Sequence, residues 1–199
     1  NLWLGQSRRR GIPPPVRGTW KLPKVSIHVP CYNEPPEMMI ETIRALEKLH
    51  YARYEVLIID NNTKDDAVWQ PVQAYVASLN RPNFKFFHLP KWPGFKAGAL
   101  NYALTQTDPD AEIVATIDSD YKVRPEWLKD LVPYFTDPEV ALMQAPQDYR
   151  DAHEDLFKRM CFWEYAGFFH LGMKTRDEKN AIIQHGTMAL IRKSSLIDV

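Results

Sequence analysis

Along residues 24–144, short apolar runs alternate with longer segments in which apolar residues recur at helical spacing. The short runs predict strands at 25–29, 54–59, 84–89, 113–118 and 140–144. Apolar residues at helical spacing predict helices after Pro35-Pro36 and at 65–79, 96–107 and 125–135. Pro71 is compatible with a helix only near its start, and Pro133 predicts a distortion. Regular alternation of strand and helix predicts an α/β fold with a mainly parallel sheet and right-handed crossovers.

The pattern changes after residue 145. Residues 153–171 predict one long helix whose apolar and aromatic side chains occupy most of its circumference. We expect this helix to pack in the core or in a subdomain, and a missing partner is the less favoured alternative. A final strand is predicted at 187–191.

Composition narrows the class of protein. The 199 residues suffice for one domain with a substantial core, and 25 basic against 25 acidic residues give no electrostatic reason to expect nucleic acid as a partner. Cys31 and Cys161 match no metal-binding spacing and are expected to be reduced thiols in a cytoplasmic setting. No stretch approaches the roughly 20 apolar residues of a membrane span, and no signal peptide is visible.

The first residues differ in composition from the rest of the chain. Residues 1–22 carry Arg8-Arg9-Arg10 and Pro13-Pro14-Pro15, which favours an extended arm or linker, and the domain is expected to occupy residues 23–199. The chain begins without methionine and stops soon after the last predicted strand. We therefore expect a piece of a longer protein.

Two carboxylates follow the predicted strand at 113–118. Asp118 and Asp120 stand where the backbone leaves the sheet, which is the edge at which open α/β sheets bind ligands. Carboxylate oxygens suit Mg²⁺ or Mn²⁺, which leave coordination positions for phosphate oxygens. An isolated Asp-x-Asp favours a helix-capping turn instead, but its neighbours at the same edge favour a site.

Chemically different residues follow the other strands. Tyr32 and Glu34 follow the first strand, Asp60 the second and Lys96 the third. A nucleoside diphosphate would use all of these groups, because an aromatic ring stacks on a base, a carboxylate accepts its N–H, and a metal and a lysine neutralise phosphate. The small residues 97–99 permit close backbone approach at a helix N-terminus that favours anions. No P-loop or dinucleotide-binding glycine motif is present.

In their order and spacing, Pro30-Cys31-Tyr32-Asn33-Glu34, Asp60, Lys96-Ala97-Gly98-Ala99-Leu100-Asn101 and Asp118-Ser119-Asp120 resemble the family 2 glycosyltransferases, and most closely the cellulose synthase and bacterial β-glucan synthase group. The resemblance implies a GT-A fold, a UDP-sugar donor, a divalent metal and inversion at the anomeric carbon. It implies that Asp118 and Asp120 are catalytic residues and that Asp120 is the metal ligand. It further implies a substrate-binding set of Tyr32, Glu34, Asp60, Lys96, Asp118, His185, Gly186 and Thr187.

Two motifs of the family are missing from these 199 residues. A Thr-Glu-Asp segment that supplies the catalytic base and a Gln-x-x-Arg-Trp motif do not occur. We expect a domain that uses UDP-glucose and a glucan acceptor, inactive alone, from a protein at the cytoplasmic face of the inner membrane. A metal-dependent nucleotidyltransferase and a non-catalytic sugar-nucleotide-binding module are the alternatives.

Overall fold

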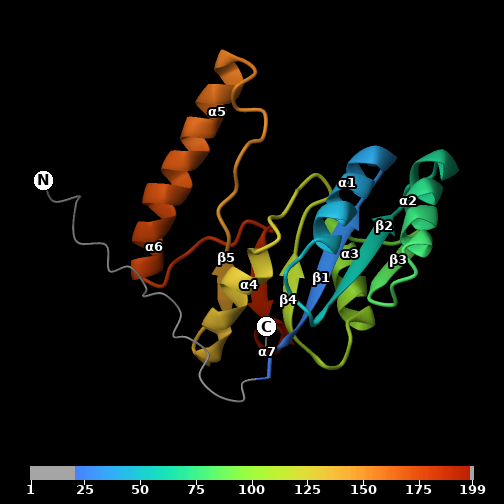
Figure 1. The fold of residues 1–199 in the computed structure, drawn as a ribbon, viewed down its shortest axis with the longest axis horizontal. Coiled ribbons are helices and arrows are strands. Elements are labelled where there is room, and N and C mark those ends of the chain that lie inside the picture. Colours follow the sequence, from blue (N-terminus) through green and yellow to red (C-terminus); the bar gives the residue numbers. More distant parts are fainter. Residues whose placement is uncertain (1–20, 198–199) are drawn as a thin grey trace, which may run out of the picture.

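The computed structural model describes residues 21–197, and a single sheet organises them (Figure 1). Its strand order is β3-β2-β1-β4-β6-β5. The strands are β1 (Lys24–Cys31), β2 (Tyr54–Asn61), β3 (Phe84–Leu89), β4 (Ala111–Thr116), β5 (Leu142–Gln144) and β6 (Ala189–Arg192). The first four strands are parallel neighbours, whereas β6 is antiparallel to both β4 and β5. The α/β prediction with a mainly parallel sheet is confirmed.

Helices cover both faces of the sheet. The α-helices are α1 (Pro36–Glu47), α2 (Asp66–Ser78), α3 (Phe95–Gln106), α4 (Trp127–Leu131), α5 (Leu156–Gly167), α6 (Lys174–Glu178) and α7 (Lys193–Ile197). A 3₁₀-helix η1 (Val132–Thr136) follows α4, and a π-helix η2 (Phe168–Met173) joins α5 to α6. The predicted distortion at Pro133 is therefore present, as the change from α to 3₁₀ geometry.

Strand β2 shows why the sheet is buried on both sides. Val56 and Ile58 belong to the larger apolar cluster with α1, α2 and α4, and Leu57 and Ile59 pack with α3 in a second cluster. Alternating side chains point to opposite faces of a strand, so a strand covered on both faces carries apolar residues on both, as residues 56–59 do. All eight residues of β2 are buried. This core holds the carboxyl ends of β1, β2 and β4 in fixed relative positions.

Two predictions about helices need correction. Helix α2 runs through Pro71, which lies inside the helix beyond its first turn rather than near its start. Asp65 caps this helix by accepting a hydrogen bond from the Ala67 amide, which supports it upstream of the proline.

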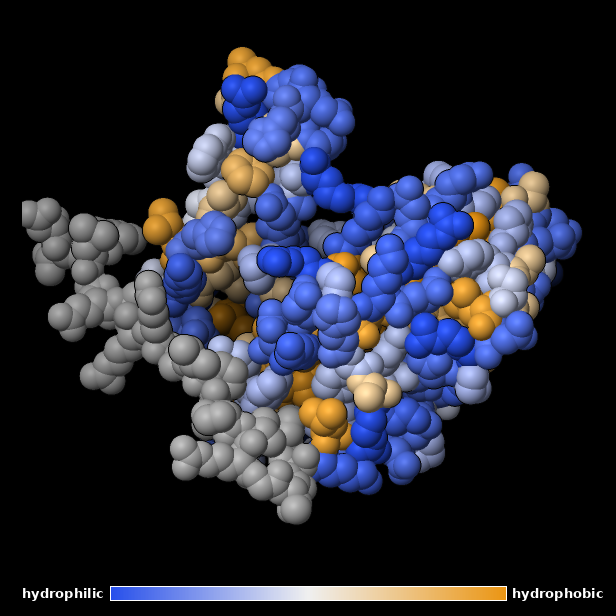
Figure 2. All heavy atoms as spheres, viewed as in Figure 1, coloured by the Kyte–Doolittle hydropathy of each residue, from blue (hydrophilic) through white to orange (hydrophobic). Residues whose placement is uncertain are grey.

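The long aromatic helix also differs from its prediction. It spans α5, η2 and α6, so it begins at Leu156 and continues to Glu178. The expected packing in the core was wrong for α5, because none of its residues is buried and Phe157 is 75% exposed. Figure 1 shows the helix extending away from the sheet, and Figure 2 shows apolar side chains at its exposed end.

The first 20 residues lie outside the described part of the chain, and so does most of the predicted arm at 1–22. Within residues 21–197, none of the helices combines the length and the apolar character that a bilayer crossing requires.

Candidate active site

A cavity of about 810 Å³ opens at the carboxyl ends of β1, β2 and β4. Parallel strands present these ends at the same edge of the sheet, so residues distant in sequence meet there. The polar side chains and aromatic rings that line the cavity are Tyr32, Glu34, Asn61, Asn62, Phe95, Lys96, Asp118, Ser119 and Asp120. The structure thus brings together most of the residues that the sequence indicated, although Asp60 is not among them.

Asp118 and Asp120 lie in a turn beyond β4. The strand ends at Thr116, two residues earlier than its predicted end, although the Ile117 amide still donates to the carbonyl of His28 at 3.1 Å. The Asp118 amide donates to the hydroxyl of Thr187 at 2.9 Å, and its carboxylate forms an ion pair with Lys96. Asp120 is exposed, and its carboxylate has no hydrogen bond or ion pair with another residue of 21–197. It is therefore the freer of the two carboxylates for a ligand.

Lys96 reaches the cavity from the first turn of α3. The helix begins after Gly94, whose φ of +85° favours glycine, and Lys96 follows two residues later. Gly98 has a different role from the predicted approach to a ligand. A Cβ there would lie 1.8 Å from the carbonyl oxygen of Pro93, so the missing side chain allows the preceding loop to fold against the helix. This close packing fixes the position of Lys96.

The loop after β1 carries Tyr32 and Glu34. Its turn is held by Asn33, which has a φ of +54° and whose amide donates to the hydroxyl of Thr63 at 2.8 Å. Tyr32 is 64% exposed, so its ring is available at the cavity for stacking. Glu34 accepts a hydrogen bond from the hydroxyl of Ser119 at 3.1 Å, which ties this loop to the segment that carries the two aspartates.

Asp60 lies beside the cavity rather than in its lining. Its side chain is nearly buried, and its two oxygens accept from the Thr63 hydroxyl at 2.5 Å and from His88 Nδ1 at 2.6 Å. The ring of His88 stacks on Trp69 at 4.1 Å between centroids. Burial, assisted by the nearby Asp60 and Glu34 carboxylates, raises the pKa of the Cys31 thiol, which therefore remains protonated next to Asp60.

Residues 184–187 approach the site from the segment before β6. Thr187 accepts from the Asp118 amide, and a Cβ on Gly186 would lie 3.8 Å from the Lys96 ammonium nitrogen. His185 lies further away, with its ring packed against Phe168 and Phe169. The structure therefore places Gly186 and Thr187 next to the lysine and aspartate, and joins His185 to the aromatic helix.

Sequence reasoning gave no role to Asn61, although its neighbour Asp60 was selected. The Asn61 amide nitrogen donates to the carbonyl of Phe95 at 2.8 Å, which connects the end of β2 to the start of α3. Its side-chain oxygen is buried, borders the cavity and has no partner within residues 21–197. An unpaired buried acceptor can receive a hydrogen bond from a ligand.

The carboxylates at the site are too few to bind a divalent cation alone, so phosphate oxygens of a bound nucleotide would have to complete its coordination. Within residues 21–197, no three His, Cys, Asp or Glu side chains gather closely enough to hold a metal ion by themselves. Mg²⁺ is commonly bound by one or two carboxylates together with phosphate oxygens and water. Asp118 and Asp120 match this pattern, because they supply two carboxylates next to a lysine that can face phosphate.

Solved structures define the fold class. Residues of this chain superpose on a mannosyltransferase from Pyrobaculum calidifontis in complex with GDP-Man and Mn²⁺, with a TM-score of 0.64, 23% identity, and coverage of 90% of this chain and 47% of that one. Residues 1–349 of S. aureus TarS in complex with UDP-GlcNAc give a TM-score of 0.55 at 21% identity, with 88% and 47% covered. The architecture is that of a GT-A glycosyltransferase.

The family follows from the sequence comparison. Residues 26–199 match the family described as "Glycosyl transferase family 2", and the chain belongs to that family. A probable glucomannan 4-beta-mannosyltransferase from Arabidopsis thaliana is 33% identical over 181 residues, which are 87% of this chain and 32% of the relative. A hyaluronan synthase from Streptococcus pyogenes is 23% identical over 185 residues, covering 92% and 44%. The chain thus spans less than half the length of these relatives.

Proposed function

We propose that this chain binds the nucleotide-sugar donor of an inverting β-glycosyltransferase that builds a polysaccharide. The carrying observation is the cavity in which Asp118 and Asp120 lie together with Lys96 and the exposed ring of Tyr32. Those groups match a nucleoside diphosphate, since they offer a stacking surface, a cation for phosphate and carboxylates for a metal. Membership of glycosyl transferase family 2 supports sugar transfer over nucleotidyl transfer.

Each group has a separate part in donor binding. Tyr32 stacks on the base, Lys96 neutralises the diphosphate, and Asp120 binds Mg²⁺ or Mn²⁺ with Asp118 beside it. The bound cation would stabilise negative charge on the departing diphosphate. Glu34 and Asp60 contact the base. Gly186 and Thr187 border the sugar end of the site. His185 completes the proposed substrate-binding set, and its ring packs against Phe168 and Phe169.

We propose UDP-glucose as the donor and a glucan as the acceptor. Similar solved structures contain GDP-Man or UDP-GlcNAc, and similar sequences include a mannosyltransferase and a hyaluronan synthase. Measuring the affinity for several nucleotide sugars therefore distinguishes between these donors. We further infer that this domain works at the cytoplasmic face of the inner membrane. The resemblance to polysaccharide synthases supports that inference.

Residues 1–199 are expected to bind donor without transferring sugar. A general base must lie within hydrogen-bond reach of the acceptor hydroxyl. Asp151 and Glu154 both pair with Lys158, and the hydrogen bond from Lys158 lowers the pKa of Asp151, which weakens it as a base. The carboxylate of Asp148 instead accepts from the amide of Tyr149, and Asp198 lies outside the described residues.

Calorimetric titration with UDP-glucose, GDP-mannose and UDP-N-acetylglucosamine tests the proposal, each with and without Mn²⁺. We expect UDP-glucose to bind in a Mn²⁺-dependent manner, and an assay of UDP release with β-glucan oligosaccharides to stay near background. Absence of binding by all three donors would contradict the proposed function. Tighter binding of another donor would correct the sugar, and acceptor-dependent turnover would direct mutagenesis to Asp148 and Asp151.

A further inference from the structure

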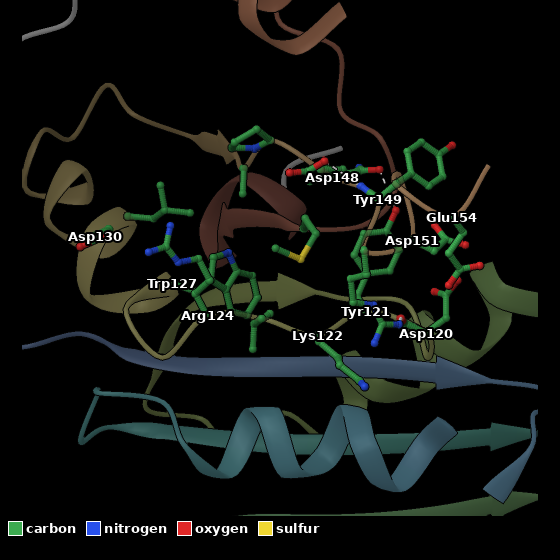
Figure 3. Close-up of a pocket in the computed structure, with 17 residues that line it drawn as sticks. Asp120, Tyr121, Lys122, Arg124, Trp127, Asp130, Asp148, Tyr149, Asp151 and Glu154 are labelled. Carbon is green, nitrogen blue, oxygen red and sulfur yellow. Dashed lines mark hydrogen bonds between the residues drawn. The ribbon is translucent and has the colours of Figure 1, made fainter. Parts of the chain in front are cut away.

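A second cavity has Asp120 in its lining (Figure 3), in common with the cavity at the carboxyl ends of β1, β2 and β4, which is the proposed donor cavity. Its volume of about 700 Å³ is within the range of about 300–1,000 Å³ that small-molecule sites commonly have. One wall is residues 120–131, including α4, and the other is residues 145–154 after β5. Asp120 lines both this cavity and the donor cavity, so a ligand in one would meet a ligand in the other at this residue.

Each of the two walls carries one buried hydrogen-bond donor that is unsatisfied within residues 21–197. Trp127 is only 6% exposed, and its indole N–H has no acceptor within residues 21–197. The side-chain amide nitrogen of Gln147 is also buried without a partner in that range. Both residues line the cavity, so a ligand there could accept from both. Buried polar groups without partners are uncommon, and a bound ligand is one explanation for a pair of them in one cavity.

Tyr121 fixes the orientation of the Gln147 amide. Its hydroxyl donates to the side-chain oxygen of Gln147 at 2.7 Å, which leaves the amide nitrogen unpaired. A tyrosine hydroxyl is protonated at neutral pH and remains a donor, so this hydrogen bond holds the amide in a single orientation.

The charges of the cavity disfavour an anionic ligand. Acidic side chains outnumber basic ones in the lining: Asp120, Asp130, Asp148, Asp151 and Glu154 against Lys122, Arg124 and Arg150. Lys122 pairs with Glu41, and Arg150 donates to the carbonyl of Asp120 at 2.9 Å. Asp151 and Glu154 pair with Lys158, which leaves the carboxylates of Asp120, Asp130 and Asp148 in the lining. A second nucleotide would meet net repulsion at this site.

A neutral sugar fits the same lining. Carboxylates accept hydrogen bonds from hydroxyl groups, the two unsatisfied donors need oxygen acceptors, and aromatic rings cover the apolar face of a pyranose. The cavity offers the ring of Tyr149 and part of the ring of Tyr121, whereas Trp127 is buried in the wall (Figure 3). Tyr149 is 40% exposed and contacts Tyr165 of α5 at 5.0 Å between ring centroids, which supports its wall from the aromatic helix.

We propose that this second cavity binds the neutral oligosaccharide acceptor, with Trp127 and Gln147 donating hydrogen bonds to its hydroxyl oxygens. The proposal rests on the proposed function, because it takes the donor cavity as the site of the nucleotide sugar. Asp120 stands at the junction, so the acceptor end would lie next to the donor. Trp127 and Gln147 are thus acceptor-binding residues, distinct from the donor set.

The indole resonance of Trp127 provides a direct test. Titration of ¹⁵N-labelled protein with cellotetraose and, separately, with laminaritetraose should move one tryptophan indole N–H signal, identified as the signal that the Trp127→Phe variant lacks. The Trp127→Phe and Gln147→Leu variants should each weaken tetrasaccharide binding about three- to tenfold, the effect of losing one hydrogen bond. Their affinity for UDP with Mn²⁺ should stay unchanged.

A matched control is Trp163→Phe, which makes the same chemical change on α5 at a side chain that is 66% exposed. It should leave tetrasaccharide binding unaltered. The spectrum of each variant shows whether it is folded. If Trp127→Phe does not fold, Gln147→Leu still tests the proposed site.

Failure of either proposal gives a distinct result. If neither tetrasaccharide binds, or if binding leaves the Trp127 signal and both variants unaffected, this acceptor site is wrong while donor binding stands. The acceptor site is also wrong if UDP with Mn²⁺ displaces the tetrasaccharide from Trp127. If the tetrasaccharide binds at Trp127 but no nucleotide binds anywhere, the site stands and the proposed donor function is wrong.

Discussion

Lys96 in α3 and Asp118 after β4 form an ion pair across the mouth of the donor cavity. Their side chains are 44% and 32% exposed, so solvent screens the pair and a bound diphosphate could compete with Asp118 for the ammonium group. The ion pair therefore keeps both side chains at the cavity, where the Lys96 ammonium group can bind a phosphate and the Asp118 carboxylate can bind a cation.

Replacing Lys96 should weaken nucleotide binding. The Lys96→Ala variant removes a charged donor to the diphosphate, so the affinity for UDP with Mn²⁺ should fall about tenfold, or about 1.4 kcal/mol. Calorimetry at low and high salt measures this, and the difference from wild type should shrink at high salt. Lys91→Ala, which removes an exposed lysine that precedes α3, is the control and should bind as wild type does. Equal loss in both variants would contradict a specific role for Lys96.

Replacing Asp120 should remove the dependence on metal. The Asp120→Ala variant loses the freer carboxylate of the site, and Mn²⁺-dependent UDP binding should weaken at least about tenfold. Affinity without Mn²⁺ should change little. Titrations of both proteins with and without Mn²⁺ decide the matter, and Asp110→Ala removes an exposed carboxylate elsewhere as a control. An unchanged Mn²⁺ effect would exclude Asp120 as a ligand.

Selectivity for the base should depend on Asp60. A carboxylate can accept the N3–H of uracil, whereas cytosine carries no hydrogen there, so UDP should bind more tightly than CDP. Asp60 is buried beside the cavity, so this bond requires the base to reach past the cavity lining to a carboxylate whose engaged oxygens retain lone pairs. Asp60→Asn should narrow the difference in binding free energy, which is on the order of 1–3 kcal/mol.

The control for Asp60 is Thr63→Val. It removes the hydroxyl that donates to Asp60 and accepts from the Asn33 amide but leaves the carboxylate in place. It should lower UDP and CDP affinity together. If wild type binds both nucleotides equally, Asp60 only organises the loop through Thr63.

Stability should fall in mild acid because of His28. Burial lowers the pKa of His28 to about 4, with the Glu55 carboxylate opposing the shift in part. The unfolded chain, where the pKa is near 6.5, then binds more protons between pH 4 and 6.5, so the free energy of unfolding rises with pH in this window. The contribution is fully present above pH 6.5 and is lost as pH falls toward 4, at up to about 1.4 kcal/mol per pH unit.

Urea unfolding at pH 7, 6 and 5 measures the slope. The His28→Gln variant should show a flatter dependence, whatever its stability at pH 7, and the exposed His153→Gln should keep the wild-type slope. An identical slope in wild type and His28→Gln would show that other groups carry the acid sensitivity.

The sequence by itself determined the sheet and the chemistry of one edge. Strand β2 illustrates the reason, since the short run of branched apolar residues at 56–59 is typical of a strand covered on both faces. Because the first four strands are parallel, their carboxyl ends lie at the same edge of the sheet. Tyr32, Lys96 and Asp118 come soon after strand ends and therefore line one cavity. Local patterns sufficed because each side chain lies within a few residues of a strand or helix end.

The tertiary structure decided what depends on distant partners. No local pattern places His88 against Asp60 from 28 residues away, or shows that Pro93 rather than a ligand fills the space at Gly98. The exposed face of α5 and the unsatisfied donors of Trp127 and Gln147 likewise follow from which segments pack together. An apolar or amide side chain has the same local preference whether a neighbour covers it or a cavity opens beside it, so only the packed chain distinguishes core from binding site.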